Sequence, residues 1–186
     1  MTSPDRGSIH QEPHGVVAIT RHYIRDLIYG ANDGLITTFA VVAAVSGGAL
    51  STRTVLIVGM ANLFADGLSM GVGNYLSIRS NEGALAALGR PEEEASPARH
   101  GVATFLAFVL AGAIPLLPYA VGASLGTGLI ASVVLTFATL FTVGALRATV
   151  TISRWWTAGV EMLALGVVVA IAAYGSGAVV ARMVNP

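Results

Sequence analysis

Long apolar stretches alternate with short polar breaks along most of this 186-residue chain. The apolar stretches lie near residues 27–50, 55–78, 101–119, 125–146 and 157–180. Each is long enough to cross about 30 Å of hydrocarbon as a helix, because one helical residue adds about 1.5 Å. The pattern therefore predicts an all-α membrane protein with five transmembrane helices.

The third and fourth spans are divided within a charge-free stretch, 101–146, that is too long for one helix. Pro115, Pro118, Gly122 and Gly126 mark the division, because proline and glycine interrupt helices. Glycines spaced four apart let helices approach closely, and we expect this of Gly67 with Gly71 and of Gly122 with Gly126.

The polar segments define the organisation of the chain. We expect a cytosolic N-terminal tail at 1–26, a five-helix domain at 27–180 that contains a short acidic cytosolic loop at 79–100, and a C-terminal tail at 181–186. Positively charged loops stay in the cytosol. With the N-terminus inside, eight arginines fall on inner segments and only Arg53 and Arg182 on outer ones. The C-terminus is therefore expected outside.

The amino-acid composition excludes several classes of protein. Hydrophobic residues make up 54% of the chain and charged residues 11%, against about 25% charged in a soluble domain. This excludes a soluble enzyme and a disordered chain. The net charge is zero, so nucleic acid is not expected as a partner, and the absence of cysteine excludes thiolate metal sites. No signal peptide is recognisable, which with the short loop favours a prokaryotic plasma membrane.

Three acids fall within the predicted spans: Asp33, Asp66 and Glu161. A charged side chain at the bilayer centre costs about 2.5–3.5 kcal/mol even on lenient scales, so each needs a partner, a wet cavity or a cation. Asp66 shares a helical stripe with Asn62 and Met70.

The stripe also has Ser69 beside it and Asn74 at its margin. Carboxylate, amide and thioether donors together suit an ion such as Fe²⁺. Alternatively, Asn62 and Asp66 bond a neighbouring helix and Met70 fills the core.

Other polar residues are open to two interpretations. Asp33, with Thr37 one turn deeper, either lines an ion path or ties the helix end to Arg25. Glu161 is expected to be solvated or paired with Arg154. In the loop, Glu92, Glu93 and Glu94 either gather cations weakly or are simply solvated. The four histidines are too scattered for a recognisable ligand spacing.

Two segments carry a family resemblance. RDLIYGANDGLITTFAVVAAVSGG and VLIVGMANLFADGLSMGVGNYLS resemble the first two helices of the vacuolar iron transporter family, and PLLPY and WWTAGVEMLALG extend the likeness weakly. The resemblance, to a short prokaryotic-type member, implies a homodimer of five-helix subunits that moves Fe²⁺, and often Mn²⁺, out of the cytosol against a proton gradient. It also implies that Asp33 and Met70 line the ion pathway.

The chain departs from that family at two places. Many plant and fungal members have a glutamate where this chain has Asn62 and a small residue where it has Asp66, so the acid has moved one turn along the same stripe. Eukaryotic members also extend the second and third helices into a glutamate-rich cytosolic metal-binding region. Only 79–100 is available here, so those ligands are not expected.

The sequence therefore favours a metal exporter that exchanges Fe²⁺ or Mn²⁺ for protons, with no bound cofactor. Proton exchange needs a buried carboxylate that alternates between ion-bound and protonated states. Two other classes stay open. A non-transporting scaffold would use the acids only to bond helices, and an intramembrane aspartyl protease would use two aspartates to activate water.

Overall fold

The computed structural model describes residues 7–148 and 154–184, and in these ranges five helical segments are long and apolar enough to cross a membrane. The prediction of an all-α protein with five spans is confirmed. The elements are α1 (Val16–Gly47), α2 (Thr52–Ala87), α3 (Pro97–Gly112), η1 (Ile114–Leu116), α4 (Leu117–Ala120), α5 (Leu125–Arg147) and α6 (Trp155–Val184). Together α3, η1 and α4 form the third span.

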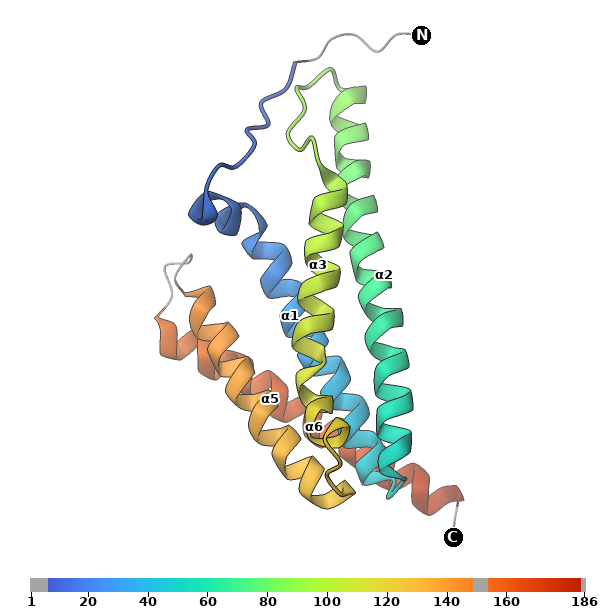
Figure 1. Cartoon of the computed structure of the whole chain (residues 1–186). Coiled ribbons are helices and arrows are strands. Elements are labelled where there is room, and N and C mark those ends of the chain that lie inside the picture. Colours follow the sequence, from blue (N-terminus) through green and yellow to red (C-terminus); the bar gives the residue numbers. More distant parts are fainter. Residues whose placement is uncertain (1–6, 149–153, 185–186) are drawn as a thin grey trace.

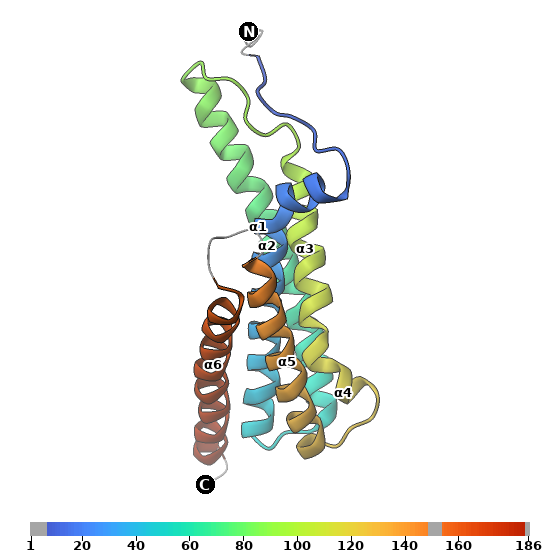
Figure 2. The ribbon, with the colours of Figure 1, turned by 90° about the vertical axis from the view of Figure 1, so that its left-hand side faces the viewer.

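Helix α1 is the centre of the bundle. It packs against α2, α3, α5 and α6, while α2 also packs on α3 and α5 on α6 (Figures 1 and 2). The upper part of α2 extends beyond the other helices and connects there to α3 (Figure 1). The N-terminal segment runs past this connection, and α6 ends at the opposite end of the bundle.

Two helices are longer than the apolar stretches that predict them. Helix α1 begins at Val16 rather than near residue 27, and α2 continues to Ala87 rather than ending near residue 78. The connection before α3 is therefore confined to 88–96 instead of 79–100. Hydropathy marks where a helix leaves lipid, whereas the helix continues for as long as its backbone hydrogen bonds do. The remaining three spans agree with the predicted ones to within four residues at each end.

The third span is broken at Pro115 and Pro118. Helix α3 ends at Gly112, and Pro115 and Pro118 each occupy a first turn, in η1 and in α4. Proline cannot donate a backbone hydrogen bond, so a break in lipid needs partners from neighbouring helices. Ser132 of α5 supplies one, because its hydroxyl donates to the Pro115 carbonyl over 2.8 Å.

Glycine lets the backbones of α1, α2 and α3 come together. A Cβ at Gly34 of α1 would collide with the backbone carbonyl of Phe108 in α3, and one at Gly71 of α2 would lie 2.8 Å from the Gly101 carbonyl. The expected packing role of Gly71 is confirmed. That of Gly122 and Gly126 is wrong, since nothing lies within 4 Å of a Cβ at either position.

We predict that Gly34→Ala destabilises the bundle by about 1–3 kcal/mol, the usual cost of overpacking, because a backbone carbonyl cannot rotate away as a side chain can. The measurement is the thermal unfolding midpoint of the purified protein in detergent. Gly73→Ala on α2 is the matched control, since a Cβ there meets nothing within 4 Å. Equal midpoints for the two variants would contradict the close α1–α3 packing.

Candidate functional site

The two predicted acids of the first two spans lie near each other. Asp33 of α1 and Asp66 of α2 are both half-buried, and their carboxylates are close enough for their like charges to repel. Each precedes a glycine, Gly34 or Gly67, that packs on Phe108 of α3, so both lie at one level of the bundle.

Neither acid has a cationic partner in the part of the chain that the structure describes. Arg25, the sequence-based partner for Asp33, instead lies 3.9 Å from the neighbouring acid Asp26. Two nearby carboxylates within an apolar bundle need protons or a cation to balance their charge. The pair is therefore the strongest candidate for an intramembrane ion site.

The other predicted path residues are arranged around this pair on α1 and α2. Asn62 and Met70 are half-buried, one turn to either side of Asp66, and the Asn62 amide nitrogen is buried without a hydrogen-bond partner among the described residues. The Thr37 hydroxyl donates to the Asp33 carbonyl over 2.8 Å, so it is tied to the α1 backbone. Ser69 is exposed.

Asn74 belongs to a second polar cluster that the sequence did not predict. Its amide nitrogen donates to Asp26 and to Thr104, each over 2.8 Å. Asp26, almost fully buried, also lies 2.5 Å from Nδ1 of His100. Asp26 is not among the predicted site residues, because residues 1–26 are expected to form a cytosolic tail. Its position four residues after His22 and seven before Asp33 places it on the same face of α1, and this spacing is the signal that could have found it.

The three loop glutamates do not form one solvated acidic patch. Glu92 pairs through its backbone with the N-terminal segment, because Ile9 donates to the Glu92 carbonyl and the Glu92 N–H donates to Gly7. The Glu93 carboxylate contacts Arg90 at 3.4 Å. The Glu94 side chain is half-buried. The buried carboxylate of Glu82 accepts hydrogen bonds from the backbone N–H groups of Glu93 and Glu94.

Glu94 is surrounded by histidines. Its carboxylate lies within 4 Å of ring nitrogens of His10, His22 and His100. Burial alone would raise the pKa of the Glu94 carboxyl, but the hydrogen bond from the Ser96 N–H, the close contact with His100 and the charges of His100 and His10 hold it below its ordinary value. The histidines are scattered in the sequence and have no recognisable ligand spacing, but the fold brings three of them together around Glu94.

Glu161 has a different partner from the one predicted. Its carboxylate accepts a hydrogen bond from Arg147 of α5 over 2.7 Å, not from Arg154 as proposed from sequence. Both side chains are partly exposed at the α5–α6 end of the bundle, so this acid lies apart from Asp33 and Asp66.

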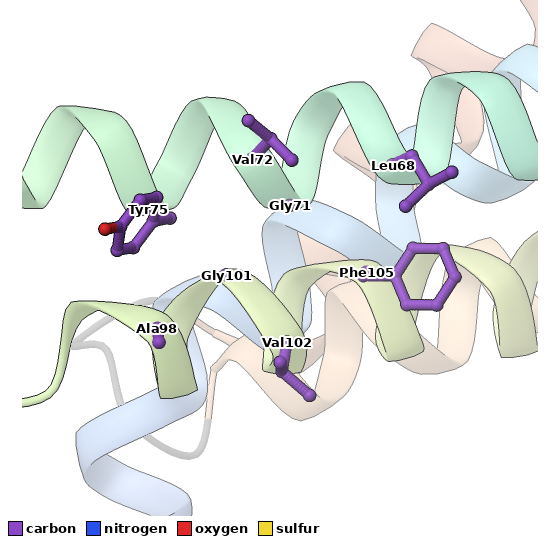
Figure 3. A pocket seen from close by; sticks show the side chains of 8 residues that line it. All are labelled: Leu68, Gly71, Val72, Tyr75, Ala98, Gly101, Val102 and Phe105. Atoms are coloured by element: carbon purple, nitrogen blue, oxygen red, sulfur yellow. The ribbon is translucent and has the colours of Figure 1, made fainter.

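An apolar groove of about 300 Å³ lies between α2 and α3 (Figure 3). Its lining residues are Leu68, Gly71, Val72, Tyr75, Ala98, Gly101, Val102 and Phe105. The groove has no charged side chain, so it does not fit a metal ion.

Comparisons with known sequences identify the family to which this chain is similar. A sequence model described as the VIT family matches residues 24–94 and 81–178. The chain is 27% identical to vacuolar iron transporter 1 of Arabidopsis thaliana, with 89% of this chain and 88% of that protein aligned. It is 38% identical to a vacuolar iron transporter of Toxoplasma gondii over 45% of this chain, which is 27% of the relative's length. A rice protein named vacuolar iron transporter homolog 5 is 34% identical over 54% of the chain and 53% of its own length.

We predict that Asn74→Ala lowers the free energy of unfolding by about 1–3 kcal/mol, because it removes one of the hydrogen bonds that the buried Asp26 carboxylate accepts. Thermal unfolding in detergent measures the change. Asn81→Ala, at an exposed position about two turns further along α2, is the control and is expected to stay within about 0.5 kcal/mol of the parent. Similar losses in both variants would reject the bridging role of Asn74.

Proposed function

Because the chain belongs to the VIT family, we propose that it exports Fe²⁺ or Mn²⁺ from the cytosol in exchange for protons. It is an integral membrane protein, and the members of its family are transporters rather than enzymes, which disfavours the intramembrane aspartyl protease. The relatives named as iron transporters support iron as one transported ion.

The observation that carries the proposal is the pair of uncompensated acids, Asp33 on α1 and Asp66 on α2, which lie close enough for their charges to interact. Two carboxylates that share a partly buried site favour either one bound divalent cation or bound protons. Exchange between these two states is what coupled transport requires. A scaffold would have no reason to keep two like charges together at a membrane position.

Met70 and Asn62 extend the site along the membrane normal. Both lie on α2 one turn from Asp66, which adds a thioether on one side and an amide on the other. Oxygen and thioether donors together suit a borderline ion that must be released again. We propose that the ion passes Met70, the acid pair and Asn62 in that order, starting from the end where α2 connects to α3.

Orientation and assembly complete the proposal. The arginine distribution places the α2–α3 connection in the cytosol, and the short chain is proposed to lie in a prokaryotic plasma membrane. We also propose a homodimer. Asp66 and Met70 stay partly exposed in the single chain, beside the exposed apolar residues Phe64 and Leu68, so a second copy would close the path.

We predict that purified protein in liposomes takes up ⁵⁵Fe²⁺ and ⁵⁴Mn²⁺ when the lumen is acidic, and that Asp33→Asn and Asp66→Asn reduce uptake to that of protein-free liposomes. Each amide keeps the shape but loses the charge and the proton site. Glu161→Gln is the control, since its carboxylate pairs with Arg147 away from the acid pair. Uptake that ignores the gradient would reject proton exchange, and uptake unchanged in both aspartate variants would reject the path.

We further predict that Asp66 has replaced the glutamate that other family members have one turn away. Asp66→Ala should abolish uptake, whereas Asn62→Ala should weaken it by about tenfold, which corresponds to the loss of about 1.4 kcal/mol from one neutral ligand. Initial rates over a range of metal concentrations measure both effects. The reverse ranking would place the essential group at Asn62.

A further inference from the structure

Side chains from three distant parts of the chain converge on Glu94, in the connection between α2 and α3. The carboxylate lies 3.0 Å from Nε2 of His100, near the start of α3, and 3.2 Å from Nε2 of His22, near the start of α1. Nδ1 of His10, in the N-terminal segment, lies 3.6 Å away. The donor atoms of His22, Glu94 and His100 are all within 4.8 Å of one another.

Two of the ring nitrogens beside Glu94 lack a well-directed hydrogen bond. The Nε2 atoms of His22 and His100, 3.2 and 3.0 Å from the Glu94 carboxylate, are buried and have no hydrogen-bond partner in the described ranges. Buried polar atoms without partners are rare and call for an explanation such as a bound ion. Donor atoms around a tetrahedral ion with bonds of about 2.1 Å are about 3.4 Å apart, close to the 3.0 and 3.2 Å between the Glu94 carboxylate and Nε2 of His100 and of His22.

A second layer of contacts orients His100 for metal binding. Its Nδ1 lies 2.5 Å from the Asp26 carboxylate, which Asn74 of α2 holds in turn over 2.8 Å. When Nδ1–H donates to Asp26, Nε2 has its lone pair free and directed at the Glu94 side. A carboxylate behind a histidine ligand is the usual outer layer of a metal site, because it fixes the tautomer and makes the imidazole a stronger donor.

The cluster is open to ions from solvent. Glu94 and His100 form part of the wall of a polar cleft of about 520 Å³, together with Arg25 and Glu82. His22 lies in the wall of a second cleft, formed by the N-terminal segment and the start of α1. An ion could therefore enter without passing through the membrane bundle.

We propose that His22, Glu94 and His100 bind one divalent transition-metal ion, with His10 as a fourth ligand from the N-terminal segment. Two or three imidazoles with one carboxylate favour ions such as Fe²⁺, Co²⁺ and Zn²⁺ over Mg²⁺ and Ca²⁺, which prefer oxygen donors. The site is separate from the intramembrane acids, since the eleven residues from His22 to Asp33 span about 16 Å of helix. It does not depend on the proposed transport.

The test measures binding of Co²⁺ to the full-length protein, purified with a histidine-free tag and carrying Asp33→Asn and Asp66→Asn to remove the intramembrane acids. Calorimetry gives affinity and stoichiometry, and visible absorption reports nitrogen ligation. We expect one ion per chain, retained in excess Mg²⁺. Glu94→Gln and His22→Gln should each weaken binding by more than about 100-fold, and Asp26→Asn by about 10–100-fold, as for an outer-layer partner.

His14→Gln is the matched control, because His14 is an exposed histidine of the same N-terminal segment outside the cluster. It should bind as the parent does. Circular dichroism and the unfolding midpoint exclude misfolding as the cause of lost binding, and Glu94→Gln keeps the shape of the side chain.

Three results would overturn the proposal: no bound ion, unchanged affinity in Glu94→Gln and His22→Gln, or an equal loss in His14→Gln. The outcome is independent of uptake into liposomes. An ion bound here without uptake would keep this site and reject the transport function. Uptake without an ion bound here would keep the transport function and reject this metal site.

Discussion

Charge compensation away from water is the constraint on which the polar interior of this protein depends. A carboxylate removed from water loses several kcal/mol of solvation unless opposite charge or hydrogen bonds replace it. Asp26 meets this requirement with His100 and Asn74, contributed by α3 and α2. Asp33 and Asp66 do not, since each faces the other's charge. The first arrangement joins three helices, and the second leaves room for an ion or protons.

Close contact of backbones makes this compensation possible. The Asn74 amide reaches Asp26 and Thr104 together only because α1, α2 and α3 approach at glycines such as Gly34 and Gly71. In lipid there is no hydrophobic drive between helices, so packing and hydrogen bonds hold them together. Glycines also suit α1 to its central position, because Gly30 and Gly34 let it approach α3 and Gly47 lets it approach α6.

Polar contacts also order the end of the bundle where α2 connects to α3. The Glu82 carboxylate accepts hydrogen bonds from the connection, and Arg99 at the start of α3 pairs with Glu12 of the N-terminal segment at 2.7 Å. The backbone of that segment bonds to Glu92. These contacts bring His10 toward the cluster formed by His22, Glu94 and His100. The proposed metal site and the proposed transport path are thus distinct. The metal site lies at the start of α1, and the path lies further along the same helix.

The sequence alone determined the number of spans, the position of the break at Pro115 and Pro118, and the presence of acids in the first two helices, because these depend on local composition and periodicity. It also carried the resemblance to the vacuolar iron transporter family, through motifs confined to single helices. Only the tertiary structure decided that Arg147 pairs with Glu161, that Asn74 holds Asp26, and that three histidines surround Glu94. Such contacts join residues far apart in the chain, and their partners depend on how helices rotate and approach, which no local pattern records.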